Sequence, residues 1–221
     1  MVALAGGSTP RGLYSLLATD ERWRASVPWE HCEFFWGDER HVPPDHPDSN
    51  ARMALEAMLS HVPVRPSRVH RVRTEEGDAA LAARLYEAEL QRTFPGDVAI
   101  PRFDLILLGL GADGHTASLF PGTDVLAEPT RLVAATRVDS LGAERITMTY
   151  PLLNAARGVM FVAAGEEKAR AVRDVLRPPP GAPYLPARRV RPTDGTLVWV
   201  IDRAAASLLD GVDIVTNFLS L

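Results

Sequence analysis

Residues 105–121 read LILLGLGADGHTASLFP, and this stretch decides the fold that we expect for the chain. A continuous apolar run ends in a glycine-rich turn that carries an acid, Asp113, and an imidazole, His115. Such a run, bounded by glycine, is typical of a strand buried on both faces of a parallel sheet. Ligands of open α/β sheets bind just beyond the carboxyl ends of such strands. Because histidine exchanges protons near neutral pH, the stretch predicts a base at a ligand site.

Strand-like and helical segments alternate along the rest of the chain. Strands are expected at residues 2–5, 32–36, 105–110, 132–136, 159–163 and 197–201, and helices at 11–17, 50–60, 79–93 and 166–176. Ser49 and Asp78 are placed as N-caps of the second and third of these helices. This alternation predicts an α/β fold, a three-layer sandwich with helices on both faces of a mostly parallel central sheet.

The proline- and arginine-rich stretch 177–192 interrupts the alternation. Only one strand–helix unit, at 197–209, follows it, which is too little for a second domain. We therefore expect one domain over residues 1–221, with 177–192 as an ordered surface loop near the site.

Composition excludes several classes of partner. The net charge of −4 gives no positive field for nucleic acid or anionic membrane, and no apolar run is long enough to span a bilayer. The start of the chain lacks the features of a signal peptide. A single cysteine, Cys32, makes an intramolecular disulfide impossible and suits a reducing compartment. We predict a cytoplasmic protein that binds neither nucleic acid nor membrane.

The segment Gly6-Gly7-Ser8-Thr9-Pro10-Arg11 joins the first strand to the first helix. Glycines allow a ligand to approach the backbone, and a helix N-terminus attracts anions, so the turn can hold phosphate. Ser8 or Thr9 is expected to cap the helix. The alternative is a plain strand-to-helix turn. The P-loop pattern is absent, which argues against a nucleoside triphosphate.

Three further cations, Arg40, Arg145 and Lys168, are candidates for binding phosphate. Arg40 ends the run FFWGDER, and its planar guanidinium suits phosphate oxygens. The alternative is a solvated turn in which Asp38 pairs with Arg40 at the surface. Arg145 and Lys168 carry weak signals individually, but together with Arg40 and the glycine turn they would converge on one phosphate.

Asp113 is placed two residues before His115, where its carboxylate can orient the imidazole. The alternative is a structural histidine, but flanking glycines at a strand end favour a functional one. The remaining histidines show no metal-ligand spacing, so no metal site is expected.

These blocks, taken in order, resemble the 6-phosphogluconolactonase family of the pentose phosphate pathway. The segments that carry the resemblance are LAGGSTPRGLY, FFWGDERHVPPDHPDSNARMA, FDLILLGLGADGHTASLFPG, ERITMTYPLLNAA, FVAAGEEKARAV and LPARRVRPTDGTLVWVID, which cover nearly the whole chain. The resemblance implies a Rossmann-like sandwich similar to glucosamine-6-phosphate deaminases and ribose-5-phosphate isomerases. It implies hydrolysis of 6-phospho-D-glucono-1,5-lactone, a phosphosugar lactone, to 6-phospho-D-gluconate, without a metal or organic cofactor.

The resemblance also assigns roles to residues of this chain. His115 becomes the general base, and Asp113 stays its orienting carboxylate on the grounds of sequence position given above. Phosphate binding is implied for Gly6, Gly7, Ser8, Thr9, Arg40, Arg145 and Lys168. Only five residues precede GGSTP, so the N-terminal helix and strand portion usual in the family is expected to be lacking. We expect a monomer or a weak homo-oligomer.

Two rival functions stay open. A glucosamine-6-phosphate deaminase or sugar-phosphate isomerase on the same fold needs an additional carboxylate to move a proton between C1 and C2. Deaminases place a glutamate after the histidine block, where this chain has Ser118-Leu119-Phe120-Pro121. The other rival is a non-catalytic sugar-phosphate sensor, but the DNA-binding segment of such regulators is missing.

Overall fold

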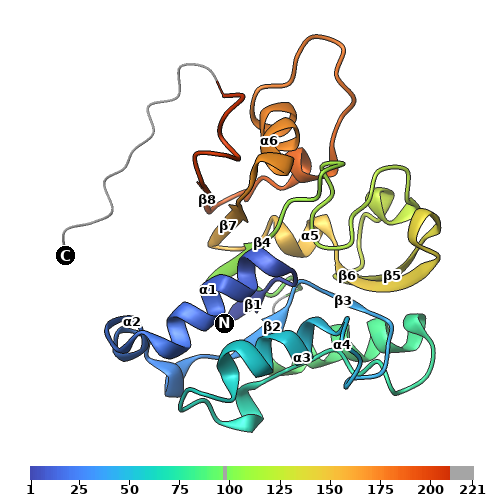
Figure 1. The fold of residues 1–221 in the computed structure, drawn as a ribbon. Coiled ribbons are helices and arrows are strands. Elements are labelled where there is room, and N and C mark those ends of the chain that lie inside the picture. Colours follow the sequence, from blue (N-terminus) through green and yellow to red (C-terminus); the bar gives the residue numbers. More distant parts are fainter. Residues whose placement is uncertain (97–98, 210–221) are drawn as a thin grey trace.

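The computed structural model of the chain describes residues 1–96 and 99–209. At its centre lies a sheet of five parallel strands in the order β2-β1-β4-β7-β8 (Figure 1). The strands are β1 (Val2–Leu4), β2 (Phe34–Trp36), β4 (Leu105–Leu108), β7 (Gly158–Ala163) and β8 (Thr196–Ile201). The predicted parallel sheet is confirmed, and its strands are those expected from the apolar runs.

Side chains alternate between the two faces of this sheet, as the period of two in a strand requires. Phe35 and Ile106 point into one buried cluster, whereas Trp36 and Leu107 point into a second one. Each face therefore has its own hydrophobic core, which is why helices cover both.

The helices divide between these two clusters. α1 (Ser8–Thr19) and α3 (Asn50–Ala54), which continues as a π-helical turn over Leu55–Leu59, pack with Trp36. α4 (Ala79–Thr93) and α6 (Ala169–Leu176) contribute to the cluster around Phe35. The prediction of helices on both faces is confirmed. The chain also forms the short helices α2 (Glu21–Ser26) and α5 (Tyr150–Leu153).

Two of the predicted helix caps are confirmed. The N–H of Leu81 donates to Asp78 Oδ1 at 2.7 Å, and the N–H of Arg52 donates to Ser49 Oγ at 3.1 Å. The helix expected after β8 is not observed, because residues 203–208 form turns instead.

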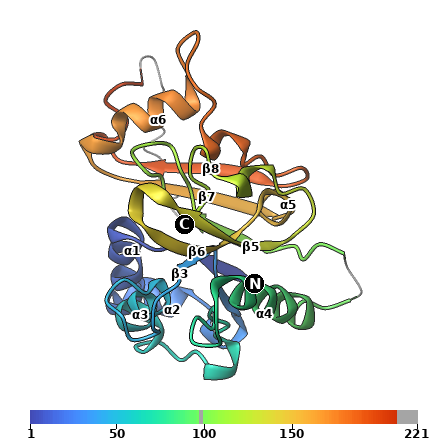
Figure 2. The ribbon, with the colours of Figure 1, turned by 90° about the vertical axis from the view of Figure 1, so that its right-hand side faces the viewer.

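A second, antiparallel sheet of three strands lies beside the large one, in the order β3-β6-β5. Its strands are β3 (Asp38–Arg40), β5 (Val133–Val138) and β6 (Ala143–Met148). Figure 2 shows this sheet between α6 and α4. The strand expected at residues 132–136 belongs here, and β3 and β6 were not expected. Their charged residues hide the strand signal in the sequence.

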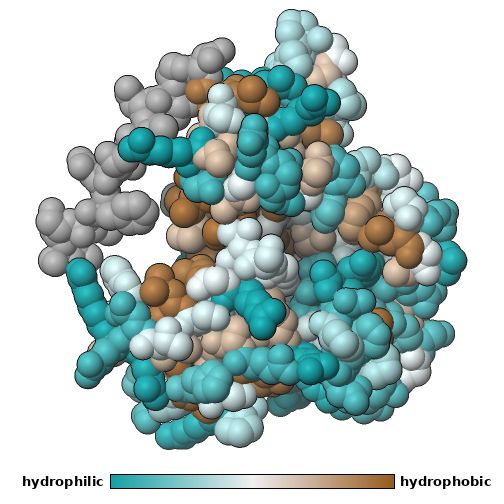
Figure 3. Space-filling model, in the orientation of Figure 1, coloured by the Kyte–Doolittle hydropathy of each residue, from teal (hydrophilic) through white to brown (hydrophobic). Residues whose placement is uncertain are grey.

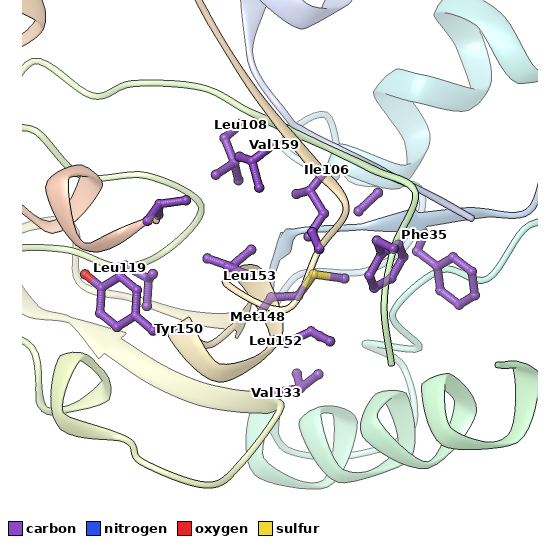
Figure 4. Packing of buried hydrophobic residues seen from close by; sticks show 14 of the residues in the cluster. Phe35, Ile106, Leu108, Leu119, Val133, Met148, Tyr150, Leu152, Leu153 and Val159 are labelled. Atoms are coloured by element: carbon purple, nitrogen blue, oxygen red, sulfur yellow. The ribbon is translucent and has the colours of Figure 1, made fainter. Parts of the chain in front are cut away.

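Gly37 joins the two sheets. Its N–H donates to Leu4 O in the large sheet at 2.9 Å, and its carbonyl accepts from Met148 N–H in the small sheet at 2.8 Å. Met148 in turn packs with Val133, Leu152 and Ile106 in the core that both sheets share (Figure 4). The backbone thus fixes the small sheet against the carboxyl end of β1.

β8 is the last strand in the order of the large sheet, and its side chains are partly open. Leu197, Val198 and Val200 are each more than one third exposed. Apolar surface is visible in the region of β7 and β8 (Figure 3). Among the described residues, no helix is long and apolar enough to cross a membrane.

Candidate active site

A pocket of about 520 Å³ opens at the carboxyl ends of β1 and β4. It is lined by every residue that the sequence placed in the site: Gly6, Gly7, Ser8, Thr9, Arg40, Asp113, His115, Arg145 and Lys168. Segments more than 100 residues apart in the chain therefore meet at one edge of the sheet, where a ligand of an α/β fold is expected.

The N-terminus of α1 forms one wall of the pocket. The first backbone hydrogen bond of the helix runs from Arg11 N–H to Gly7 O at 3.1 Å, so the N–H groups of Ser8 and Thr9 have no partner within the helix. Such groups, together with the helix dipole, favour an anion.

The expected capping by Ser8 or Thr9 is wrong. Gly7 occupies the N-cap position with φ of 102°, and no side chain caps the helix. Only glycine adopts this conformation readily, so the chain turns into the helix one residue earlier than expected. Both hydroxyls then lie inside the first turn and remain free for a ligand.

Arg40 and Arg145 come from the neighbouring strands β3 and β6. The Nε atoms of both are buried and have no hydrogen-bond partner. One Nη of Arg40 donates to Asp48 O at 2.5 Å. Burial, followed by the positive charge of Arg40, lowers the pKa of Arg145 below its ordinary value. Two partly buried cations with unused donors suit the oxygens of a phosphate.

His115 stands in the pocket on the loop after β4. Its Nδ1 lies 2.5 Å from Asp113 Oδ1, and the same oxygen accepts the backbone N–H of His115 at 3.1 Å. The ring stacks on Phe120, with centroids 3.9 Å apart. With Nδ1 donating to the carboxylate, the neutral ring has its lone pair on Nε2, the form that a general base requires.

Gly111 allows the imidazole to take this place. A Cβ at Gly111 would lie 2.1 Å from His115 Nδ1, so the imidazole would have to move. The absence of a side chain at Gly111 is thus needed for the close approach of the His115 ring.

The loop over residues 177–192 supports the histidine loop, as predicted for an ordered segment near the site. Ala187 N–H donates to Gly114 O at 3.0 Å, and Tyr150 Oη donates to Pro186 O at 2.9 Å.

Sequence reasoning missed Asp38 and Asn50, which also line the pocket. The surface pairing of Asp38 with Arg40 is wrong, because Asp38 is only 9% exposed and accepts from Ser118 Oγ at 2.7 Å. The signal was present: residues 38 and 40 are two apart on a strand, so both face the same side.

Glu39, between them, faces the opposite way and is buried. Its carboxylate accepts the N–H groups of Arg40, Asn50 and Ala51 at 2.7–2.8 Å and the hydroxyl of Ser49 at 3.1 Å. This network fixes β3 to the start of α3. Within residues 1–96 and 99–209, no group of three or more His, Cys, Asp or Glu side chains could hold a metal ion.

Comparison with known proteins agrees with this architecture. Residues 1–199 match the family model described as glucosamine-6-phosphate isomerases/6-phosphogluconolactonase. A 6-phosphogluconolactonase of Synechocystis sp. is 44% identical over 94% of this chain and 84% of its own length.

Solved structures show the same similarity. A 6-phosphogluconolactonase from Trypanosoma cruzi superposes with a TM-score of 0.79 at 33% identity, covering 95% of this chain and 84% of that one. A monomeric glucosamine-6-phosphate deaminase of the NagB superfamily gives a TM-score of 0.74 at 25% identity, covering 94% and 87%.

The fold and the pocket together define an α/β enzyme of the superfamily that contains sugar-phosphate deaminases and lactonases. The parallel sheet, the glycine turn before α1 and the histidine loop after β4 are in place. Within that superfamily the chain belongs to the 6-phosphogluconolactonase family.

Proposed function

We propose that the chain hydrolyses 6-phospho-D-glucono-1,5-lactone to 6-phospho-D-gluconate in this pocket, with His115 as the general base. The activity is that of the family, 6-phosphogluconolactonase. The observation that supports the role of His115 best is its 2.5 Å contact with Asp113 in a pocket that also contains Arg40, Arg145 and Lys168.

The phosphate of the lactone binds at the cationic end of the pocket. The free N–H groups of Ser8 and Thr9 and the guanidinium groups of Arg40 and Arg145 donate to its oxygens, and Lys168 adds a further charge. This end does not react. Its contribution is to hold C1 of the sugar in front of His115, and such positioning lowers the barrier by restricting the motion of the reactants.

At the other end, Nε2 of His115 takes a proton from water while the water oxygen bonds to C1. Negative charge moves to the carbonyl oxygen and returns when the bond from C1 to the ring oxygen breaks. The protonated imidazole then gives its proton to that oxygen, and His115 is restored. Asp113 holds the ring and stabilises its charged form. A lactone is an activated ester, so no covalent intermediate is required.

The experiment is a hydrolysis assay with freshly prepared lactone, read against the spontaneous reaction. His115→Ala is expected to lower kcat by about 10²–10⁴-fold, which is the usual contribution of a general base. Phosphate-dependent binding should survive. His31→Ala, at an exposed histidine outside the pocket, serves as the matched control. Near-normal turnover in His115→Ala would remove the residue from this role.

Asp113→Asn tests the orienting carboxylate. The amide can hold the ring in the wrong tautomer, so kcat should fall while KM changes little. A variant with unchanged kcat would make Asp113 a loop residue only.

Deamination or isomerisation of an aminosugar phosphate is the rival reaction, and one feature of the pocket makes it worth testing. Besides Asp113, the pocket contains a second carboxylate, Asp38, which the analysis of the sequence did not place in the site. Wild-type protein offered glucosamine 6-phosphate should release no ammonia; release at a rate similar to lactone hydrolysis would favour the rival.

We further propose that the active form is a monomer or a weak homo-oligomer of one domain that works in the cytoplasm. Light scattering across a range of protein concentrations tests the first of these points, and a stable oligomer at low concentration would contradict it.

A further inference from the structure

Asp38 is a buried, charged residue of the pocket that the hydrolysis described above does not use. Its Oδ2 accepts from Ser118 Oγ at 2.7 Å, and its Oδ1 accepts from Asn50 Nδ2 at 3.3 Å. Both donors are neutral and fully buried. Among the described residues, no cation forms an ion pair with this carboxylate. A carboxylate can accept about four hydrogen bonds, so part of its capacity stays unused.

Burying a carboxylate whose hydrogen-bond donors are all neutral is costly even with the charge of Arg145 acting on it, and donors from a ligand would lower that cost. Asp38 is part of the pocket wall, so a ligand bound in the pocket could donate further hydrogen bonds to its carboxylate.

The position of Asp38 indicates which part of the ligand it meets. Asp38 and Arg40 are two residues apart on β3, so they share a face and their Cα atoms lie about 6.6 Å apart. On the other side, Asp38 bonds to Ser118, three residues after His115 in the same loop. The carboxylate therefore lies between the phosphate end and the imidazole end of the pocket.

We propose that Asp38 accepts hydrogen bonds from ring hydroxyl groups of the bound sugar phosphate and thereby determines which sugars the enzyme accepts. The inference rests on the proposed function, because that function sets the phosphate at Arg40 and C1 at His115. An ionised carboxylate only accepts, and a hydroxyl can donate, so the two are complementary.

Such an acceptor discriminates between sugars because it stays without a hydrogen-bond donor when the wrong sugar is bound. A sugar that lacks the matching hydroxyl, or holds it on the other face of the ring, leaves a buried charge without its donor. Sites built to bind a hydroxyl reject analogues that lack it far more strongly than apolar pockets do. Ser118 and Asn50 hold the carboxylate in place and act as positioning residues.

The first test needs no variant. Titration calorimetry of wild-type protein compares glucose 6-phosphate with its 2-deoxy, 3-deoxy and 4-deoxy analogues. At least one deoxy analogue should bind about 10–100-fold more weakly, since a hydrogen bond to a charged group contributes about 1.5–3 kcal/mol. Equal affinity for all four would overturn the proposal.

The second test uses Asp38→Asn, which keeps the shape of the side chain and removes its charge. The variant should bind glucose 6-phosphate more weakly than wild type does. Its affinity for the deoxy analogue that wild type rejects should change little, so the affinities of the variant for these two ligands should become similar. A purely structural role would weaken all ligands by the same factor, which would count against the proposal. Asp124→Asn, at an exposed acid outside the pocket wall, is the matched control and should leave the ratio unchanged.

These binding tests do not depend on turnover. If wild-type protein fails to hydrolyse the lactone, the proposed function falls while the deoxy series still reports on Asp38. If hydrolysis proceeds and the affinities of the deoxy series do not differ, only the role of Asp38 falls.

Discussion

Arg40 and Arg145 lie directly opposite each other on the antiparallel strands β3 and β6. Like charges in this relationship destabilise a sheet. Neither Nε atom has a hydrogen-bond partner, and the charge of Arg40 contributes to the lowered pKa of Arg145. The fold thus holds two cations together at a cost that an anion between them would offset.

Arg145→Met should therefore separate stability from binding. Without ligand, the free energy of unfolding is expected to rise by about 0.2–1 kcal/mol, because the cross-strand repulsion disappears. The KM for the lactone should rise about 10–100-fold, with a smaller change in kcat. Urea denaturation with and without inorganic phosphate checks the first effect and initial rates the second. A variant that is less stable without ligand, with an unchanged KM, would make Arg145 a structural residue.

Gly111→Ala should damage catalysis without unfolding the protein. The new methyl group would meet His115 Nδ1, so the ring must move away from Asp113. A displacement of about 1 Å is enough to cost about 100-fold in rate. Gly12→Ala, where a Cβ meets no atom within 4 Å, is the control; it should keep kcat and stabilise α1 by about 0.5–1 kcal/mol. Equal activity in the two variants would contradict the close packing of Gly111 and His115.

Glu39 makes stability depend on pH. Burial raises the pKa of this carboxyl above its ordinary value, although hydrogen bonds from three backbone N–H groups act against the shift. A raised pKa means that the folded state prefers the protonated form. Its contribution to stability is therefore complete below the unfolded pKa and is lost as pH rises through the folded one.

We expect the stability of wild type relative to Glu39→Gln to fall as pH rises above the ordinary pKa of a glutamate, about 4.3. Urea denaturation at a series of pH values measures it, with Glu30→Gln, at an exposed glutamate, as the matched control. A relative stability that rises over this range would mean that the hydrogen bonds outweigh burial.

His70 stabilises the fold at a place remote from the pocket. Its Nε2 lies 2.8 Å from Glu33 Oε2 and its Nδ1 lies 2.7 Å from Glu89 Oε1, and the ring stacks on Phe35. Removing the ring takes a hydrogen-bond partner from each of these two partly buried carboxylates, which then keep, among the described residues, only Arg68 and Arg92 as ion-pair partners. His70→Ala should lower the free energy of unfolding by about 2–3 kcal/mol, somewhat less than for a fully buried pair. Chemical denaturation measures this loss, and kcat should stay unchanged; a kcat that falls with stability intact would contradict it.

The sequence predicted the large sheet better than the small one. Strands β4 and β7 are uninterrupted apolar runs, and nothing competes with that signal. β6 reads AERITM, in which Glu144 and Arg145 conceal the alternation of a strand whose one face lines a polar pocket. A strand that serves the ligand therefore loses the apolar pattern by which strands are found.

The candidate site was predicted as a set of residues and not as a geometry. His115 and Arg40 stood out because glycines and strand ends flank them. Asp38 did not, since its hydrogen-bond partner Ser118 is 80 residues away in the chain. The expected capping by Ser8 was wrong because a second glycine offers the helix a different start.

Gly37 links the two sheets whose residues line the pocket. It ties the sheet that presents the imidazole to the sheet that presents both arginines. The separation between His115 and the two arginines is accordingly constrained by main-chain hydrogen bonds, before any side chain adjusts. A change that shifts either hydrogen bond of Gly37 would move His115 relative to Arg40 and Arg145 together, so a residue without a side chain sets how the two sides of the pocket face each other.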